Sequence, residues 1–176
     1  WAFSPKLRGM SVKNFRSQKA NAILRAPSPV IRIEQGDKVY IILENTHYFP
    51  HTLHFHGVDH PFKTSTGGDN DGVPVTGEKP VMPGKTRTYE LQPRHAGTNL
   101  YHCHVQTDKH LMMGLNGMLV VEENKPNNWV QTFNVGAGHV RHPSVAIKEK
   151  FDREYDLHYQ SIDKNLAKTI QKSNDI

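Results

Sequence analysis

Short segments of alternating or continuous hydrophobic residues recur along the chain between residues 28 and 122. Alternation places successive side chains on opposite faces of a strand, so these segments predict β-strands. The run 38–43 (KVYIIL) is almost entirely apolar and predicts a strand that is buried over much of its surface. The expected strands are residues 30–34, 38–43, 51–56, 86–91, 98–103 and 118–122.

Turn-forming residues separate these segments, and residues 57–83 predict a long loop marked by Gly-Gly, Asp-Gly and Pro-Gly pairs. No convincing helical pattern interrupts the strands. Short strands at regular spacing, with turn residues between them, predict an all-β fold. We expect a Greek-key β-sandwich or barrel.

The two ends of the chain are patterned differently from the middle. The first residues are basic and weakly patterned, and predict an arm or an edge strand. Near the other end, residues 151–159 predict one more strand, and Ser161 is expected to cap an amphipathic helix that runs to Lys172. The predicted organisation is an arm, a core and a C-terminal extension with a strand and a short helix: residues 1–26, 27–124 and 125–176.

The composition is that of one folded domain without a membrane span. A chain of 176 residues can bury a real hydrophobic core, and no apolar run approaches the ~20 residues that a membrane helix needs. The net charge of +5 is modest, and the lysines and arginines of the chain are scattered among acidic residues; both features argue against nucleic-acid binding. The chain begins at Trp1 rather than Met, so we expect a processed terminus and a removed export signal.

The single cysteine and the twelve histidines are the unusual part of the composition. One cysteine excludes an internal disulfide, so Cys103 is free, buried or bound to metal. Side chains at even offsets share a face of a strand, and those at odd offsets point the opposite way. If strands 51–56 and 98–103 are neighbours, two back-to-back clusters follow. One joins His51 and Cys103, with His110 returning from a loop; the other holds His54, His56, His102 and His104.

Two imidazoles and one thiolate, as in the first cluster, are the ligands of a trigonal type-1 copper site. The soft thiolate stabilises Cu(I), and the imidazoles accept Cu(II). A zinc site with one cysteine and two histidines is the rival interpretation, although copper outcompetes zinc at such ligands. The simplest alternative is a buried, inert cysteine among histidines that are satisfied by hydrogen bonds in the core.

Three segments resemble the superfamily of multicopper oxidases and copper nitrite reductases, which is built from cupredoxin domains. They are PHTLHFHG, DGVPVTGEKPVMPGKTRTYEL and AGTNLYHCHVQTDKHLMMGLNGMLVVE, in that order along residues 28–122. The resemblance implies a cupredoxin-like fold with copper as cofactor. It also implies type-1 copper ligands at His51, Cys103 and His110, and a second copper site at a domain interface formed by His54, His56, His102 and His104.

The sequence departs from the family pattern at Leu115, where many members carry an axial methionine. Leucine does not coordinate metal, so the resemblance implies a three-coordinate copper, or one that binds an exogenous ligand, with a raised reduction potential. Met112 and Met113 are at the wrong spacing and are expected in the core or in a lid.

Only one cupredoxin domain is visible, whereas the family builds its interface copper site from two. His139 and His142 are candidates to contribute from a neighbouring chain, although an ordinary polar loop is the simpler interpretation. The tail FDREYDLHYQSID resembles the first strand of a second domain. We therefore expect it to pack on a neighbouring subunit, with a trimer favoured; the alternative is a tail folded on its own domain.

The first functional hypothesis is a type-1 copper redox protein that transfers electrons at the exposed edge of His110. Its open axial position, at Leu115, would accept a small ligand such as nitric oxide. The alternative is an oxidoreductase with a second copper site that reduces nitrite or dioxygen; His54 stands where nitrite reductases carry an acid, which argues against nitrite. The third functional hypothesis is copper storage or delivery. The resemblance implies an extracytoplasmic location and a redox partner protein that the sequence does not identify.

Overall fold

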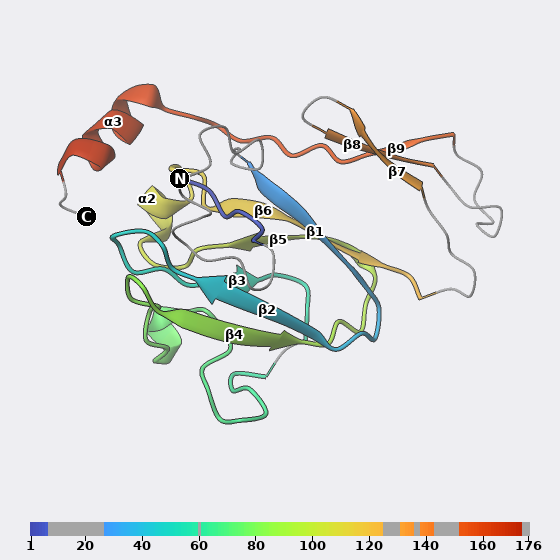
Figure 1. Cartoon of the computed structure of the whole chain (residues 1–176), viewed down its shortest axis with the longest axis horizontal. Helices are drawn as coiled ribbons and strands as arrows, with labels where there is room; N and C mark the ends of the chain where they lie inside the picture. The colour runs from blue at the N-terminus through green and yellow to red at the C-terminus, as the bar shows by residue number, and fades with distance from the viewer. Residues whose placement is uncertain (7–26, 60, 125–130, 136–137, 143–151, 174–176) are drawn as a thin grey trace.

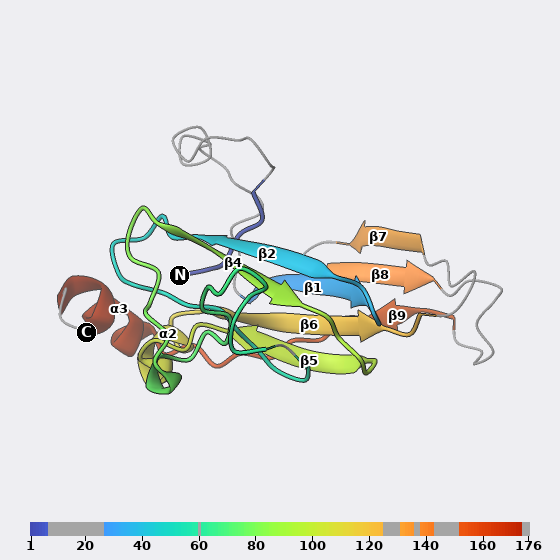
Figure 2. The ribbon, with the colours of Figure 1, turned by 90° about the horizontal axis from the view of Figure 1, so that it is seen from below.

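The computed structural model describes residues 1–6, 27–59, 61–124, 131–135, 138–142 and 152–173. Most of the expected N-terminal arm therefore lies outside the described residues. The core is a sandwich of two sheets (Figures 1 and 2). One has the order β1-β6-β5-β3 and the other pairs β2 with β4: β1 (Ser28–Glu34), β2 (Val39–Glu44), β3 (His54–Phe55), β4 (Thr86–Leu91), β5 (Gly97–His102) and β6 (Asn116–Glu122).

The parallel pairing of β1 with β6 is the exception among antiparallel ladders. Apolar side chains from both sheets meet between them, which is why the alternating segments form strands here. The buried cluster is Leu43, Leu53, Phe55, Val81, Tyr89, Leu91, Tyr101 and Leu119. The predicted all-β sandwich is confirmed.

The exposure of strand β2 differs from the prediction. Its outer face is open to solvent, with Tyr40 61% and Ile42 68% exposed, whereas Leu43 faces the core. The apolar run does not mark a strand buried on both sides, because β2 lies in a two-stranded sheet that is covered on one face only.

The expected strand 51–56 is also shorter than predicted. His51 makes an isolated bridge with Val81, and only the residues of β3 join the larger sheet, beside β5. The chain thus pairs with Val81 at His51 and with β5 at His54, so these two histidines lie in different surroundings.

Two short helices interrupt the region that showed no helical pattern: η1 (Pro74–Thr76) and α2 (Thr107–His110). Each is too short to produce a periodic pattern in sequence. Helix α2 carries His110 at its end, so the residue expected on a loop lies on a single helical turn.

The C-terminal extension forms a third sheet and a helix: β7 (Gln131–Val135), β8 (Gly138–His142), β9 (Glu154–Tyr155) and α3 (Lys164–Ser173). Strand β9 is much shorter than the predicted strand 151–159. Asp163, not Ser161, caps α3: its Oδ1 accepts hydrogen bonds from the amides of Asn165 (2.8 Å) and Leu166 (3.0 Å), as the residue before the first helical position does.

The extension contacts its own core. Arg32 of β1 binds both Glu154 and Asp156, and Gln160 Nε2 donates to the Leu111 carbonyl over 3.0 Å. From the third sheet the chain runs along the core to α3, which lies at the end of the molecule where α2 lies (Figure 1). These contacts favour the alternative in which the tail folds on its own domain.

Candidate metal centre

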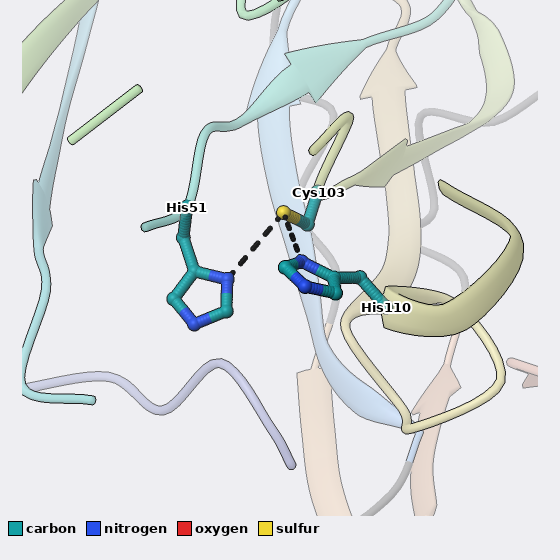
Figure 3. A group of neighbouring side chains, drawn as sticks. All are labelled: His51, Cys103 and His110. Carbon is teal, nitrogen blue, oxygen red and sulfur yellow. Dashed lines mark hydrogen bonds between the residues drawn. The ribbon is translucent and has the colours of Figure 1, made fainter. Parts of the chain in front are cut away.

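His51, Cys103 and His110 converge at one end of the sandwich, as strand parity predicted (Figure 3). Their ligand atoms all lie within 4.8 Å of one another. Cys103 Sγ is 3.5 Å from His51 Nδ1 and 3.2 Å from His110 Nδ1. The three residues are 5%, 0% and 1% exposed, so the group is enclosed by protein.

The loop after β5 is closed by its own backbone. The Cys103 amide donates to the Leu115 carbonyl (3.0 Å), and the Leu115 amide donates to the His110 carbonyl (3.1 Å). Gln106, with φ of 40°, precedes α2, and this left-handed conformation turns the chain sharply into the helix. The loop therefore fixes Cys103 and His110 relative to each other.

Burial keeps both imidazoles neutral at physiological pH. Burial, reinforced by the nearby His110, His47 and N-terminus, lowers the pKa of His51 to about 3. Burial, and then His47, lowers the pKa of His110 to about 4. Burial raises the pKa of the Cys103 thiol, so a metal must displace its proton. Two neutral imidazoles and one thiolate in a dry pocket fit copper, whose Cu(I) and Cu(II) states these ligands suit.

His47 belongs to this group, although the sequence did not suggest it. Its Nδ1 lies 2.9 Å from His51 Nε2, on the side of the His51 ring away from the sulfur. When a metal binds His51 Nδ1, which faces Cys103, the ring proton is left on Nε2, and Nε2 can then donate to His47. Such a partner fixes the tautomer and orientation of a ligating imidazole.

His110 does not have the exposed edge expected for electron transfer. Its side chain is 1% exposed, and the ring of Trp1 stands edge-on to it with centroids 5.2 Å apart. His110 was expected to reach the surface, but the aromatic side chain of Trp1 covers it. Electron transfer between the site and the surface would therefore have to use other residues.

Leu115, at the position of the missing axial methionine, is buried and tied by its backbone to Cys103. Met112 and Met113 follow α2 and are half-buried. Whether the axial position is open to a ligand stays a prediction.

The second cluster gathers on the opposite side of β5. His54 pairs with His102 across β3 and β5, and the four rings have neighbouring centroids 5.0–5.6 Å apart: His54, His56, His102 and His104. His54 Nδ1 donates to the Asp71 carbonyl (2.7 Å), and His102 Nδ1 donates to the Cys103 carbonyl (2.9 Å). Both rings therefore present Nε2 as the remaining ligand atom.

This cluster is less complete than the first. His56 Nε2 lies 2.9 Å from His102 Nε2. Among the described residues, however, only His51, Cys103 and His110 bring three such atoms within 4.8 Å of one another. His139 and His142 lie on β8, and their side chains are outside what the structure describes. Among the described residues the four histidines therefore form a cluster of neighbouring rings, with no set of three ligand atoms brought this close together.

Buried polar residues that the sequence analysis missed support both clusters. Thr52 Oγ1 accepts from the His104 amide (3.1 Å), and Asn45 organises the turn that carries His47. Both lie within a few residues of the histidines, but no periodic pattern marks a side chain that bonds to a turn.

The sequence profile of the multicopper oxidase family matches residues 17–126. The chain belongs to the multicopper oxidase family. It is 35% identical over 103 residues to the iron transport multicopper oxidase FET3 of Candida glabrata, covering 57% of this chain and 15% of that protein. It is 32% identical over 108 residues to a multicopper oxidase of Staphylococcus aureus, covering 60% and 22%.

The structure agrees with this assignment. It is similar to the multi-copper oxidase from Pseudomonas thermotolerans with a TM-score of 0.52 and 36% identity, over 58% of this chain and 24% of that one. The cupredoxin-like fold is confirmed, and copper is the cofactor of the family. This multicopper oxidase domain spans less than a quarter of the length of these relatives. Within the described residues, every helix is too short or too polar to cross a membrane.

Proposed function

We propose that this chain is a copper oxidoreductase domain with one complete and one partial copper site. His51, Cys103 and His110 would hold a type-1 copper, and the four histidines of the second cluster would hold another metal together with a neighbouring domain or subunit. The observation that supports this function is the position of Cys103, a buried ligand of the first group whose two sequence neighbours, His102 and His104, belong to the second.

When bound, copper supplies one-electron oxidation and reduction at these sites. Cys103 contributes the soft thiolate, while His51 and His110 contribute neutral nitrogens, and burial excludes water from the group. The peptide bonds that join Cys103 to its flanking histidines connect the two clusters covalently. The hydrogen bond from His102 Nδ1 to the Cys103 carbonyl adds a second connection. The chain thus links a single-electron site to a site that faces a partner.

The experiment that tests the proposal is copper stoichiometry with visible and EPR spectra of the copper-loaded chain. We expect an intense thiolate-to-copper band that is lost in Cys103→Ser. We also expect additional copper that is lost in His56→Ala while the band remains. One copper per chain in every oligomeric state, with a normal band, would contradict the second site. A colourless protein would contradict the type-1 site, and a chain that binds no copper at all would contradict both sites.

The alternative function is electron transfer alone, with small-ligand chemistry at an open axial position. Leu115 favours it, because a buried hydrocarbon side chain replaces the expected thioether. Nitric oxide is the ligand we propose to add to the copper-loaded protein. A new spectrum on its addition, with only one copper per chain, would support this function over the two-site one.

We propose an extracytoplasmic location and a homo-oligomer, with a trimer favoured, by likeness to the family. A second site made of four histidines from one chain needs further ligands from elsewhere. Because the tail contacts its own core, those ligands would come from a surface of the partner other than its tail.

A further inference from the structure

His51 reaches toward the surface through its ring nitrogen that does not face the metal group. Its Nε2 lies 2.9 Å from His47 Nδ1, and the His47 ring lies 4.1 Å, centroid to centroid, from the ring of Tyr48. Tyr48 is 49% exposed. A continuous series of three rings therefore leads from a buried ligand to solvent, whereas His110 is covered.

A buried asparagine holds this path in place. Asn45 Oδ1 accepts from the His47 amide (2.9 Å), and its Nδ2 donates to the carbonyls of Phe49 (2.7 Å) and Val81 (2.8 Å). Val81 in turn exchanges two backbone hydrogen bonds with His51 (3.1 and 2.8 Å). His47, through Asn45, and His51, through its backbone, are thus both anchored to Val81.

Aromatic rings surround this part-buried contact. His47 packs against Trp1 (4.6 Å between centroids) and Phe49 (5.4 Å) as well as Tyr48. A polar contact that is partly shielded from water is electrostatically stronger than one that is fully solvated.

We propose that His47 is the electron relay of this domain. With copper held by His51, Cys103 and His110, one electron would pass from an outer-sphere reductant at the Tyr48 surface through His47 and His51, and Cu(II) would be reduced to Cu(I). The reductant is oxidised by one electron, no bond is broken and no proton is transferred. The inference rests on the proposed copper site at His51, Cys103 and His110, and gives His47 a role in electron transfer through its contact with His51, not in binding the metal.

The test is the rate at which hexacyanoferrate(II), a one-electron reductant, bleaches the thiolate-to-copper band of the copper-loaded full chain. His47→Phe keeps a ring but removes the hydrogen-bond acceptor. We expect about tenfold slower reduction, equivalent to about 1.4 kcal/mol in activation free energy. His47→Asn places Oδ1 near the position of Nδ1 and should restore most of the rate. His95→Phe, at the exposed loop before β5 and at the end of that strand away from Cys103, is the matched control.

The band and the reduction potential are measured for each variant. A slower rate in His47→Phe with both unchanged supports the relay. A rate that equals that of the parent chain, or that falls only as far as a shifted potential requires, overturns it. If His47→Phe does not load copper, Tyr48→Leu serves instead, because its side chain contacts none of the three ligands in the ring contacts described. Slower reduction supports the route and an unchanged rate overturns it.

The relay and the copper site fail in different ways. A parent chain without a thiolate-to-copper band overturns the copper site, and the relay with it. A parent chain with the band, and with His47 variants that reduce normally, overturns only the relay.

Discussion

His54 and His102 are direct partners across β3 and β5, and Cys103, the next residue after His102, points to the other side of the sheet. One pair of neighbouring strands thus separates the histidine cluster from the cysteine group. The two sites share backbone but no side chain, so a change in one cluster need not disturb the other.

Removing His56 should therefore weaken copper binding at the second site alone. His56 faces His102 at 2.9 Å between Nε2 atoms, and no contact described joins it to the cysteine group. We expect His56→Ala to weaken copper binding there by roughly 100-fold or more, because loss of even a residue that only supports a ligand costs about 10–100-fold, with an unchanged visible band. Equilibrium dialysis and EPR across a range of chain concentrations measure this.

The second site should also fill only where copies of the chain, or an added partner domain, associate. His95→Ala, an exposed histidine outside both clusters, is the control and should bind copper normally. Full occupancy of both sites by a monomer would show that the four histidines are a complete site.

Glu78 anchors the loop that supports the histidine segment. It is buried and accepts hydrogen bonds from the Gly72 amide (2.5 Å) and the Tyr89 hydroxyl (3.2 Å), and it pairs with Arg87. Tyr89 in turn accepts from the Leu53 amide (3.0 Å). Because Glu78→Ala leaves these donors without an acceptor, it should lower the free energy of unfolding by roughly 3 kcal/mol.

Denaturant unfolding of the apo chain measures this loss. Asp59→Ala removes an acid that pairs with Arg94 at the surface, over 3.3 Å with both side chains more than half exposed, and should cost less than about 1 kcal/mol. Equal effects of the two substitutions would show that the Glu78 network contributes little.

Buried tyrosines should make the fold sensitive to alkaline pH. Burial raises the pKa of Tyr101, whose hydroxyl donates to the Pro29 carbonyl over 2.6 Å; burial also raises the pKa of Tyr89. The folded chain holds these protons more tightly than the unfolded chain, whose tyrosines titrate near pH ~10. The stability they contribute is therefore complete below that pH and is lost as pH rises toward the folded pKa.

Each such tyrosine should steepen the loss of stability above pH ~10 by about 1.4 kcal/mol per pH unit. Tyr101→Phe should remove one such contribution, while costing about 1 kcal/mol at neutral pH for the lost hydrogen bond. Unfolding curves at several pH values decide, with the exposed Tyr159 mutated to Phe as control. A slope that Tyr101→Phe leaves unaltered would contradict this assignment.

Strand parity predicted only part of the grouping of the site residues. His102 and Cys103, adjacent at the end of β5, face opposite sides of the sheet, as a period of two requires. His51 lies outside β3 and is separated from His54 because the segment changes its pairing partner, which parity alone does not show. The period of two also predicted residues 86–91 as the strand they form.

Features set by irregular or tertiary structure could not be predicted in this way. Nothing in the run 38–43 shows that Tyr40 and Ile42 would face solvent, since that depends on which layers cover the sheet. His47 lies in a turn whose shape depends on buried hydrogen bonds of Asn45. The cover over His110 comes from Trp1, more than a hundred residues away along the chain.

Leu115 offers the sharpest test of the copper site. If it occupies the axial position, Leu115→Met supplies a thioether that favours Cu(II), so the reduction potential should fall, by about 59 mV for each tenfold change in the preference between oxidation states. Redox titration of the visible band measures the potential. Met113→Leu is the matched control, because Met113 lies two residues away and is not expected to coordinate; its potential should equal that of the parent chain. A rise in the potential of Met113→Leu instead, with no effect of Leu115→Met, would mean that Met113 supplies the axial thioether.

Azide addition extends the test of Leu115. Azide should alter the spectrum of the parent chain if the axial position is open. It should not alter the spectrum of Leu115→Met, because the thioether would then fill that position.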